Sequence, residues 1–352
     1  MSAQEKKKIA VILFNLGGPD SRESIKPFLF NFFMDKNIIQ APIFVRFFLA
    51  KLISIRRSKK EAGDSYAELG NKSPLLENSQ AQLKALEKLL NNSKTHEFKV
   101  FLSMRYWHPM ADKVAKEVQN YNADELVLLP LYPQFSTTTT RSSFQSWEKA
   151  CKQIKLQKPT TSICCYPFDE GFIKASAENV QKIYKQAKNE TGKSPRILFS
   201  AHGLPEKIIE QGDPYQWQCE QAAHRIVEAL KIKNLDWKIC YQSRVGPLKW
   251  IGPSTDDSIK QAAEDGVPVV IYPHAFTQEH VETLVELEIE YREMAEEMGL
   301  HDFYRVPTVG TQEPFIQGLA DIVHKNLGAH KTTSDEGTPL CPSGFSECCM
   351  RS

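Results

Sequence analysis

The stretch Arg196-Ile-Leu-Phe-Ser-Ala-His202-Gly-Leu-Pro205 indicates the end of a buried strand. A short apolar run stops there, because Gly203 and Pro205 disfavour a continuing strand and favour a turn. His202 is therefore predicted to lie where the carboxyl end of a strand meets a loop, the place where open α/β sheets bind ligands. Histidine changes protonation near neutral pH and is a common metal ligand. The alternative is a histidine that only caps the strand end through a hydrogen bond.

A second stretch has the same order of elements. An apolar run over 269–272 predicts a strand, and a break at Pro273 separates it from a helical pattern. Thr277 is the predicted N-cap of that helix, which places Glu279 and His280 in its first turn. Both stretches thus lead from a strand end to a residue that can exchange a proton or bind a metal.

Four carboxylates recur along this predicted helix at three- and four-residue spacing, which places them on one ridge. They are Glu279, Glu282, Glu286 and Glu290. A solvated acidic face is the plain interpretation, although neighbouring like charges destabilise a helix. Because the row begins at a strand end and includes His280, it also suits carrying a divalent cation in or protons out.

The chain has 352 residues, which is too long for one compact core and predicts about two domains. Its formal net charge of +1 gives no indication of nucleic-acid binding. No apolar run approaches the length of a membrane span. The polar N-terminus, residues 1–8, contains no signal-peptide core, so a cytoplasmic protein is expected. The sequence does not indicate an oligomeric state.

The first half begins with a continuous apolar run over 9–14, as expected of a strand buried on both faces. It ends at Gly17-Gly18-Pro19, which lacks the G-x-G-x-x-G pattern, so a nicotinamide cofactor is not expected. These glycines instead favour close approach of the backbone to a flat ligand. Two further strands are predicted over 99–103 and 125–131.

An aromatic-rich segment over 27–57 interrupts this first half. Its aromatic residues are Phe28, Phe30, Phe32, Phe33, Phe44, Phe47 and Phe48, and basic residues follow at Lys51, Arg56 and Arg57. Helix packing explains about half of such positions. The remainder fits either an apolar lip on a membrane surface or the wall of an apolar pocket.

The second half repeats the order of the first, with strands that end at His202, at 241–244 and at 272–274. Helical patterns between strands, such as 175–187 and 220–230, suit crossover connections of a parallel sheet. The predicted fold is α/β, with two similar doubly wound parallel-sheet domains related by duplication. Their predicted bounds are 8–160 and 161–327, followed by a polar linker and cysteine-rich tail over 328–352.

Six motifs in order resemble the ferrochelatase family, from about Ile9 to Val323. They are Asn15-Leu-Gly-Gly-Pro19, Arg105-Tyr-Trp-His-Pro109, Leu131-Tyr-Pro-Gln-Phe-Ser136, Ser200-Ala-His-Gly-Leu-Pro205, Tyr241-Gln-Ser-Arg-Val-Gly-Pro247 with Trp250, and Phe276-Thr-Gln-Glu-His-Val-Glu-Thr-Leu284. The resemblance implies a lyase that inserts ferrous iron into protoporphyrin IX to make haem.

The resemblance also implies roles for residues. His202 and Glu282 would contact the iron, with His202 as the base that removes pyrrole protons, and Glu279, His280 and Glu286 would lie behind Glu282. The porphyrin would contact Leu16, Trp250 and the aromatic segment. Candidates for the propionates are Arg56, Arg57, Tyr66 and Arg141, the last within the hydroxyl-rich stretch 136–143.

The sequence contains eight cysteines, three of them in the tail at Cys341, Cys348 and Cys349. Three thiolates in a short segment suit iron–sulfur or zinc binding and need a fourth ligand. Some ferrochelatases hold a [2Fe–2S] cluster with three C-terminal cysteines and one internal cysteine, and the resemblance makes Cys164 or Cys165 the internal candidate. Adjacent Cys348 and Cys349 cannot easily point at one metal. A tail of unligated thiols is the alternative.

Three other functions compete with protoporphyrin metallation. A coproporphyrin III ferrochelatase would need a more polar pocket mouth than the aromatic segment predicts. A sirohydrochlorin or cobalt chelatase would be shorter. A non-catalytic haem or iron–sulfur sensor would not need the predicted acid–base pair. A peripheral membrane contact through the aromatic segment is a further expectation.

Overall fold

The computed structural model describes residues 6–59, 61–244 and 246–351. Most of the polar N-terminus considered above, and the last residue of the predicted tail, lie outside these ranges.

The chain divides into two compact units, and neither is one continuous stretch. The first contains Met1–Cys165 and Leu319–Leu340, and the second contains Tyr166–Gly318 and Cys341–Ser352. The predicted bounds of 160 and 327 differ from this division. Residues 319–340 return to the first unit because their backbone completes its sheet, so the segment predicted as linker and tail, 328–352, includes a strand.

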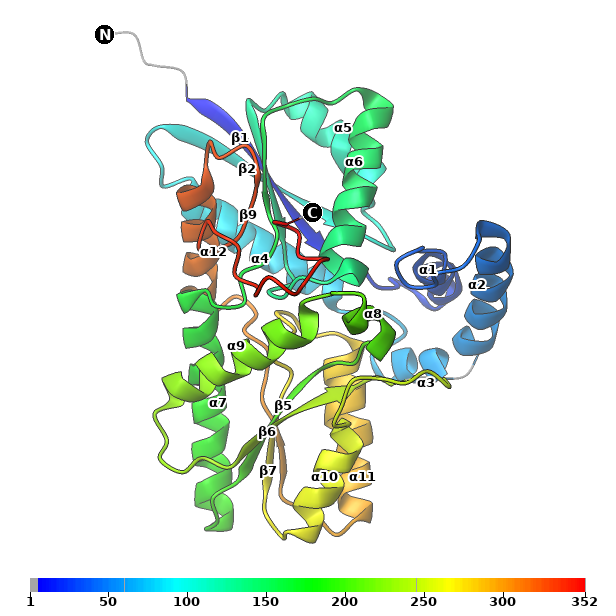
Figure 1. Cartoon of the computed structure of the whole chain (residues 1–352), viewed down its shortest axis with the longest axis vertical. Helices are drawn as coiled ribbons and strands as arrows, with labels where there is room; N and C mark the ends of the chain where they lie inside the picture. The colour runs from blue at the N-terminus through cyan, green and yellow to red at the C-terminus, as the bar shows by residue number, and fades with distance from the viewer. Residues whose placement is uncertain (1–5, 60, 245, 352) are drawn as a thin grey trace. The chain divides into compact units, whose positions relative to one another are not determined.

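The first unit is built on a five-stranded sheet in the order β2-β1-β3-β4-β9, with every pairing parallel (Figure 1). Its elements are β1 Lys7–Asn15, α1 Arg22–Phe33, α2 Ile43–Ser58, α3 Glu61–Glu68, α4 Leu75–Leu90, β2 His96–Met104, α5 Ala111–Tyr121, β3 Glu125–Pro130, the π-helix η1 Thr137–Arg141, α6 Ser142–Ile154, β4 Thr160–Ile163 and β9 Thr332–Thr333. Helix α12, Glu313–Asn326, passes from the second unit into the first.

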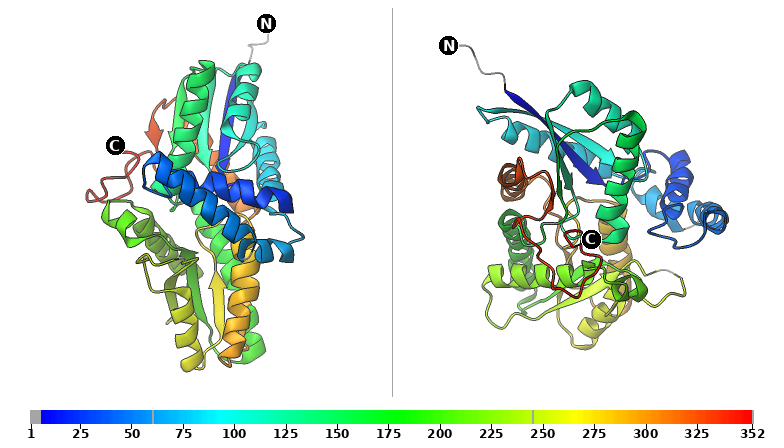
Figure 2. Two further views of the ribbon diagram at one scale, coloured as in Figure 1. Left: turned by 90° about the vertical axis from the view of Figure 1, so that its right-hand side faces the viewer. Right: turned by 45° about the horizontal axis from the view of Figure 1, so that its top comes forward.

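Strand β1 is buried on both faces, as its continuous apolar sequence predicts. Ala10, Ile12 and Phe14 pack against α5 and α6, while the intervening Ile9, Val11 and Leu13 are equally buried and belong to the opposite face. Helices therefore cover both faces of this sheet (Figure 2). The buried carboxylate of Glu125 accepts hydrogen bonds from the amine of Lys7 and the backbone N–H of Gly328, and so fixes the returning segment to the sheet.

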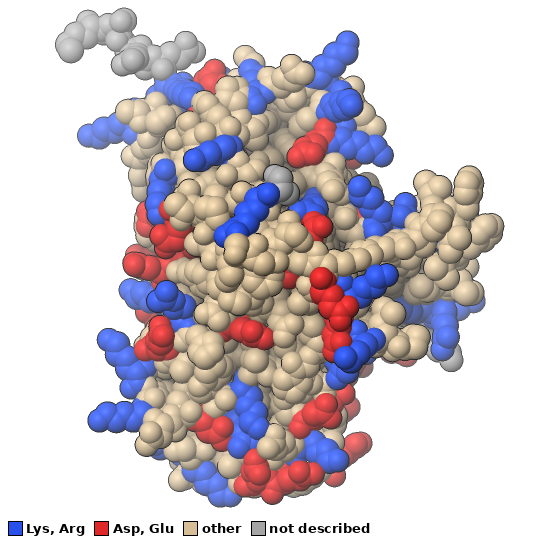
Figure 3. All heavy atoms as spheres, viewed as in Figure 1, with Lys and Arg blue, Asp and Glu red and all other residues tan. Residues whose placement is uncertain are grey.

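Helices α1 and α2 form the aromatic lip predicted from 27–57. Phe28 and Phe33 are buried, whereas Phe44 is 78% and Phe48 70% exposed on α2. The exposed apolar side chains of α2 are Ile43, Phe44, Val45, Phe47, Phe48, Leu49 and Leu52. Figure 3 shows this projection as an uncharged surface with basic side chains near its base. Within the described ranges, no helix combines the length and apolar character that a membrane crossing requires.

The second unit repeats the strand order of the first, as β6-β5-β7-β8, again entirely parallel. Its elements are α7 Glu170–Thr191, β5 Arg196–His202, α8 Glu206–Glu210, α9 Tyr215–Leu230, β6 Trp237–Gln242, α10 Thr255–Glu264, β7 Val269–Tyr272, the π-helix η2 Glu282–Glu290, α11 Tyr291–Glu297 and β8 Phe303–Arg305. The prediction of two similar doubly wound domains is confirmed.

Strands β5 and β7 lie side by side at the centre of the second sheet. Helices α7 and α9 pack on one face, and α10, η2 and α11 pack on the other. The chain leaves β5 toward β6 on one side, and it reaches β8 from β7 on the other. The carboxyl ends of β5 and β7 therefore form the switch point of this sheet, where doubly wound folds bind ligands.

Candidate active site

His202 is the last residue of β5, as the sequence predicts, and its side chain is 37% exposed. The residue after His202 must be glycine, because a side chain at this position would collide with neighbouring groups. A Cβ at Gly203 would lie 2.8 Å from the carbonyl oxygen of Gln242 and 3.4 Å from the indole of Trp250. Trp250 is thus placed beside the strand end that carries His202, and its indole N–H is buried without a hydrogen-bond partner among the described residues.

The helix after β7 differs from the predicted one. It begins at Glu282 and is a π-helix up to Glu290, with the N–H of Tyr291 bonded to the carbonyl of Glu286. Thr277 is not its N-cap. The ring of His280 takes that role, since its Nδ1 accepts hydrogen bonds from the backbone N–H groups of Glu282 at 3.1 Å and Thr283 at 3.4 Å.

His280 is therefore held by the helix it caps. Nδ1 accepts hydrogen bonds, so the neutral ring carries its proton on Nε2, which alone remains for proton exchange. Burial lowers the pKa of His280 and outweighs the opposing effect of Glu282 and Glu279. The ring also packs edge-on against Phe276 at 4.5 Å.

Three of the four glutamates that were predicted to share one side of the helix do so. Glu282, Glu286 and Glu290 follow one another every fourth residue in η2, and a π-helix, with its wider i→i+5 turn, keeps such residues on one side. Oε2 of Glu282 lies 2.9 Å from Nδ1 of His202. The carboxylate of Glu286 accepts hydrogen bonds from the N–H of Ser243 at 2.8 Å and from its hydroxyl at 2.6 Å.

The carboxyl of Glu286 exchanges its proton closer to neutral pH than an ordinary glutamate does. Burial raises its pKa, the charge of Glu282 raises it further, and the hydrogen bonds from Ser243 only partly oppose them, so that the pKa is about 7. Tyr291 also donates a hydrogen bond to Glu286, at 3.2 Å. Ser243 has a left-handed backbone with φ of +61°, an uncommon conformation for serine. In this conformation its backbone N–H points at the carboxylate of Glu286.

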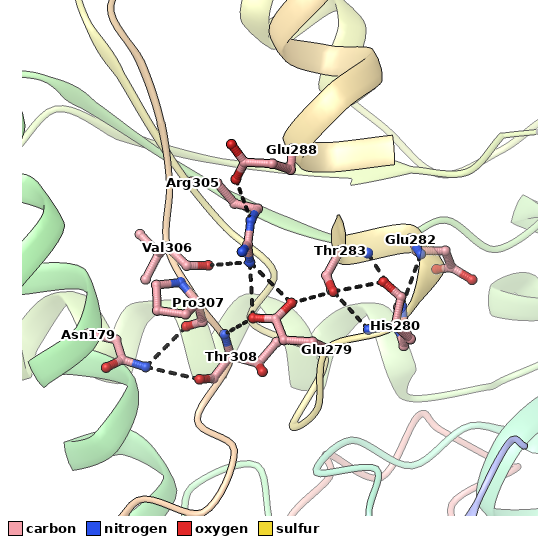
Figure 4. A network of polar contacts seen from close by, with 10 residues as sticks. All are labelled: Asn179, Glu279, His280, Glu282, Thr283, Glu288, Arg305, Val306, Pro307 and Thr308. Atoms are coloured by element: carbon pink, nitrogen blue, oxygen red, sulfur yellow. Dashed lines mark hydrogen bonds and ion pairs between the residues drawn. The ribbon is translucent and has the colours of Figure 1, made fainter. Parts of the chain in front are cut away.

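Glu279 lies outside the ridge, contrary to the prediction (Figure 4). It precedes η2, and its carboxylate accepts hydrogen bonds from Arg305 at 3.0 and 3.1 Å and from the backbone N–H of Thr308 at 2.9 Å. Burial alone would raise the pKa of Glu279, but Arg305 and the hydrogen bonds from Thr283 and Thr308 outweigh it and hold the pKa below its usual value. The ionised carboxylate of Glu279 therefore has a structural role, in binding Arg305 and the loop at Thr308.

The candidates for porphyrin contact in the first unit lie on four different elements or loops. Leu16 follows β1, Arg56 and Arg57 lie in the last turn of α2, and Tyr66 lies in α3 with 5% of its surface exposed. The guanidinium of Arg141, at the end of η1, lies 5.6 Å from the ring centroid of Phe135.

A polar network in the first unit was not predicted. The buried carboxylate of Asp35 accepts hydrogen bonds from Arg105 at 2.8 Å, from the hydroxyl of Tyr106 at 2.7 Å and from the hydroxyl of Ser142. Arg105 and Tyr106 belong to a motif noted in the sequence. Asp35 could not be found in this way, because it follows an aromatic stretch and only the fold brings it to the end of β2.

The cysteines of the predicted cluster are largely buried. In the first unit, the sulfur atoms of Cys164 and Cys165 lie 3.3 Å apart. In the second, Cys341 and Cys348 are 2% and 3% exposed in a tail without helix or strand, and Gln218 donates a hydrogen bond to the sulfur of Cys341. Across residues 6–59, 61–244 and 246–351, no three His, Cys, Asp or Glu side chains form a metal-binding group.

Two similar parallel α/β units, with their strands in the same order, give this chain the chelatase fold. The structure of SirB from Bacillus subtilis with Fe3+ has this fold, with a TM-score of 0.50 and 11% identity, over 92% of this chain and 96% of that one.

The family model Ferrochelatase matches residues 8–327, so the chain belongs to the ferrochelatase family. Ferrochelatase of Pelagibacter ubique (strain HTCC1062) is 48% identical over 344 residues, which cover 97% of this chain and 98% of that protein. Ferrochelatase of Caulobacter vibrioides (strain NA1000 / CB15N) is 48% identical over 347 residues, or 98% of each chain. Ferrochelatase of Wolbachia sp. subsp. Drosophila simulans (strain wRi) is 51% identical over 315 residues, or 90% of this chain and 98% of that one.

Proposed function

We propose that this chain inserts ferrous iron into protoporphyrin IX to give protohaem, with His202, Glu282 and Glu286 as the side chains that act on the iron and the protons. Family membership supports the lyase reaction. The observation that carries the residue assignment is the 2.9 Å contact between Nδ1 of His202 and Oε2 of Glu282 at the switch point of the second sheet.

Metal insertion replaces two pyrrole N–H protons by one Fe²⁺, so the site must accept two protons. With Glu282 ionised, the Nδ1–H of His202 donates to it, which leaves the lone pair of Nε2 available to accept a pyrrole proton. Glu286, with a pKa of about 7, can take a proton from this pair near neutral pH and release it to solvent. His202 thus acts as the base and Glu286 as the next acceptor.

The iron arrives hydrated and must exchange water for protein ligands before it enters the ring. A carboxylate oxygen of Glu282 is a suitable ligand for a divalent first-row cation, and Nε2 of His202 is a suitable ligand only while it holds no pyrrole proton. Both groups must be unprotonated to bind it, so metal binding and proton release are coupled. The acidic side of η2, which continues to the exposed Glu290, attracts cations toward this pair.

The porphyrin contacts remain proposals. Trp250 supplies an aromatic wall beside His202, with its ring packed against Gly203. Leu16 and the lip supply apolar surface, and Arg56, Arg57, Tyr66 and Arg141 are the proposed propionate partners. The relatives do not favour a coproporphyrin enzyme or a non-catalytic sensor.

A peripheral membrane contact through α2 is a second part of the proposal. Phe44, Phe48 and Leu52 are each more than 60% exposed, at 78%, 70% and 66%, and Arg56 and Arg57 follow in the last turn of the same helix. An apolar helix face followed by basic residues suits insertion into the headgroup region of an anionic bilayer. Protoporphyrin is apolar, so a lip at the bilayer would also place the enzyme near its substrate.

A [2Fe–2S] cluster held by Cys341, Cys348, Cys349 and an internal cysteine is a third part. An all-thiolate set is the chemistry such a cluster requires, and the thiols of Cys341 and Cys348 are buried although their tail has no helix or strand. Fe²⁺ in the reaction is substrate, and no catalytic step above involves the cluster. Single serine substitutions of Cys164 and Cys165 distinguish the two internal candidates by iron content.

Anaerobic uptake of Fe²⁺ into protoporphyrin IX and coproporphyrin III, followed by absorbance, tests the function. Turnover of protoporphyrin well above coproporphyrin is expected. Preferential turnover of coproporphyrin would reverse the substrate assignment, and stoichiometric binding of haem without turnover would indicate a sensor.

A further inference from the structure

Arg305 donates hydrogen bonds to two glutamates, Glu279 and Glu288, that belong to different parts of the chain around η2. From the end of β8 its Nη1 donates to Glu279, before η2, and its Nε donates to Glu288, within η2, at 2.7 Å (Figure 4). The side chain of Arg305 is 13% exposed. The two residues it links lie on either side of Glu282 and Glu286 in the sequence.

The strand side of this link is itself fixed. The N–H of Val306 donates to Ile271 of β7, so the chain directly after Arg305 is tied to the central sheet. Asn179 of α7 donates to the carbonyls of Pro307 and Thr308, and the N–H of Thr308 donates to Glu279. The backbone that follows Arg305 is therefore held in place by the central sheet and by α7.

The helix side of the link leads directly to the site. The hydroxyl of Thr283 donates to the carboxylate of Glu279 and accepts a hydrogen bond from the N–H of His280. His280 caps the N–H groups of Glu282 and Thr283. The start of η2, and with it the carboxylate of Glu282, is thus placed through contacts that end at Arg305.

We propose that Arg305 is a positioning residue for metal insertion, which sets the placement of Glu282 and Glu286 by bridging Glu279 and Glu288. The planar guanidinium can donate to both carboxylates at once, whereas a single ammonium cannot keep that geometry. Arg305 does not act on substrate; it holds the segment that does. The inference rests on the proposed roles of Glu282 and His202.

Arg292 provides a matched control on the same segment. It donates to Glu288 at 2.6 Å and to the carbonyl of Phe303 at 2.6 Å, so it also ties the helix to β8. A purely structural tie between helix and strand would depend on both arginines, whereas the proposed link from β8 to Glu279 runs through Arg305.

The experiment compares Arg305→Met, Arg292→Met and the double variant Arg305→Met/Glu279→Gln, by kcat and KM for protoporphyrin and by unfolding temperature. Arg305→Met is expected to lower kcat about tenfold or more with KM within about twofold, because a small misplacement of reacting groups affects kcat strongly. Arg292→Met is expected to lower the unfolding temperature while keeping kcat within about twofold. The double variant also removes the charge of Glu279, which would otherwise have lost its guanidinium partner, so its unfolding temperature should recover while kcat stays low.

Recovery of kcat together with stability in the double variant would overturn the proposal, as would wild-type kcat in Arg305→Met or an equal loss in Arg292→Met. If Arg305→Met does not fold, the double variant and Arg305→Lys provide the same comparison, with low kcat expected in both. His202→Ala, measured in the same experiment, distinguishes failure of the proposed site from failure of the positioning role. Full activity of His202→Ala refutes the proposed site. Full activity of the Arg305 variants refutes only the positioning role.

Discussion

Nδ1 of His202 lies 2.9 Å from Oε2 of Glu282, although the two residues are 80 positions apart in the sequence. The pair forms because β5 and β7 are neighbours whose carboxyl ends meet at one edge of the sheet, and each strand leads directly to one partner. The first two predictions test this pair.

Replacement of His202 by alanine is expected to leave protoporphyrin binding within a few-fold and to lower metal insertion by at least about a hundredfold, because the ring supplies the proton acceptor. Fluorescence quenching measures binding, and absorbance measures insertion of Fe²⁺ or Zn²⁺. His301→Ala, at an exposed position of the same unit, is the control and should behave as wild type. Full turnover by His202→Ala would remove His202 from the mechanism.

Glu282→Gln keeps the shape of the side chain and removes its charge. It should cause a large loss of kcat because the partner of His202 and the metal ligand are both lost, whereas Glu290→Gln, at the exposed end of η2, should have a small effect. Steady-state kinetics at several Fe²⁺ concentrations measure both. Equal and trivial effects would mean that the row of glutamates is only a solvated face.

The third prediction concerns pH. The folded pKa of Glu286, about 7, lies above the ordinary value of 4.5, so between these pH values the native state binds more protons than the unfolded state. Stability is therefore expected to fall as pH rises from about 4.5 to about 7, and Glu286→Gln should flatten this part of the profile. Urea unfolding at intervals across that range measures the effect, and an unchanged slope in the variant would contradict it.

The fourth prediction concerns the lip. Because Phe44, Phe47 and Phe48 are exposed, changing all three to serine should weaken binding to vesicles containing anionic lipid while the free energy of unfolding changes little. Phe28→Ser is the contrasting control, since Phe28 is buried and its loss should cost about 3–5 kcal/mol. Co-sedimentation with vesicles and urea unfolding separate the two effects. Unchanged vesicle binding by the triple variant would exclude this surface as the contact.

The fifth prediction concerns the tail. Thiolate-bound iron–sulfur clusters absorb visible light, so anaerobically purified protein should be reddish-brown, and Cys341→Ser should remove both the colour and the acid-labile sulfide. A cross-link from the tail to Cys164 or Cys165 closes a long loop, so the same change should lower the unfolding temperature, by an amount corresponding to a few kcal/mol. Wild-type protein without iron, sulfide or a visible band would refute the cluster and leave the chelatase assignment unaffected.

The sequence predicts the elements whose pattern is local. The apolar run over 9–14 and the break after His202 each correspond to a strand and its end, because burial on both faces and turn residues leave a direct mark in the sequence. Strand β9 was missed because Thr332–Thr333 is too short to show any period, and only its pairing with β4 defines it.

The start of the glutamate helix was mispredicted for a related reason. Thr277 and Glu279 fit an N-cap and first turn by local rules, but Arg305, 26 residues later, binds Glu279 and His280 caps the helix instead. Tertiary contacts thus decide the turn at which the helix begins, and no pattern in the helix itself reports them. Ser243 lay within a recognised motif, yet its hydrogen bonds to Glu286 depend on the same displaced helix.

The return of residues 319–340 to the first unit has a consequence for synthesis on the ribosome. The chain emerges from its N-terminus, so strands β1 to β4 appear long before β9, and Glu125 awaits the N–H of Gly328 while the whole sheet of the second unit is made. The unit that begins the chain therefore cannot be completed until the sheet of the second unit has been synthesised. A nascent chain that has emerged from the ribosome up to about residue 318 would display a four-stranded second sheet ready to fold and a first sheet with an open edge at β4, and such an open edge is exposed to mispairing.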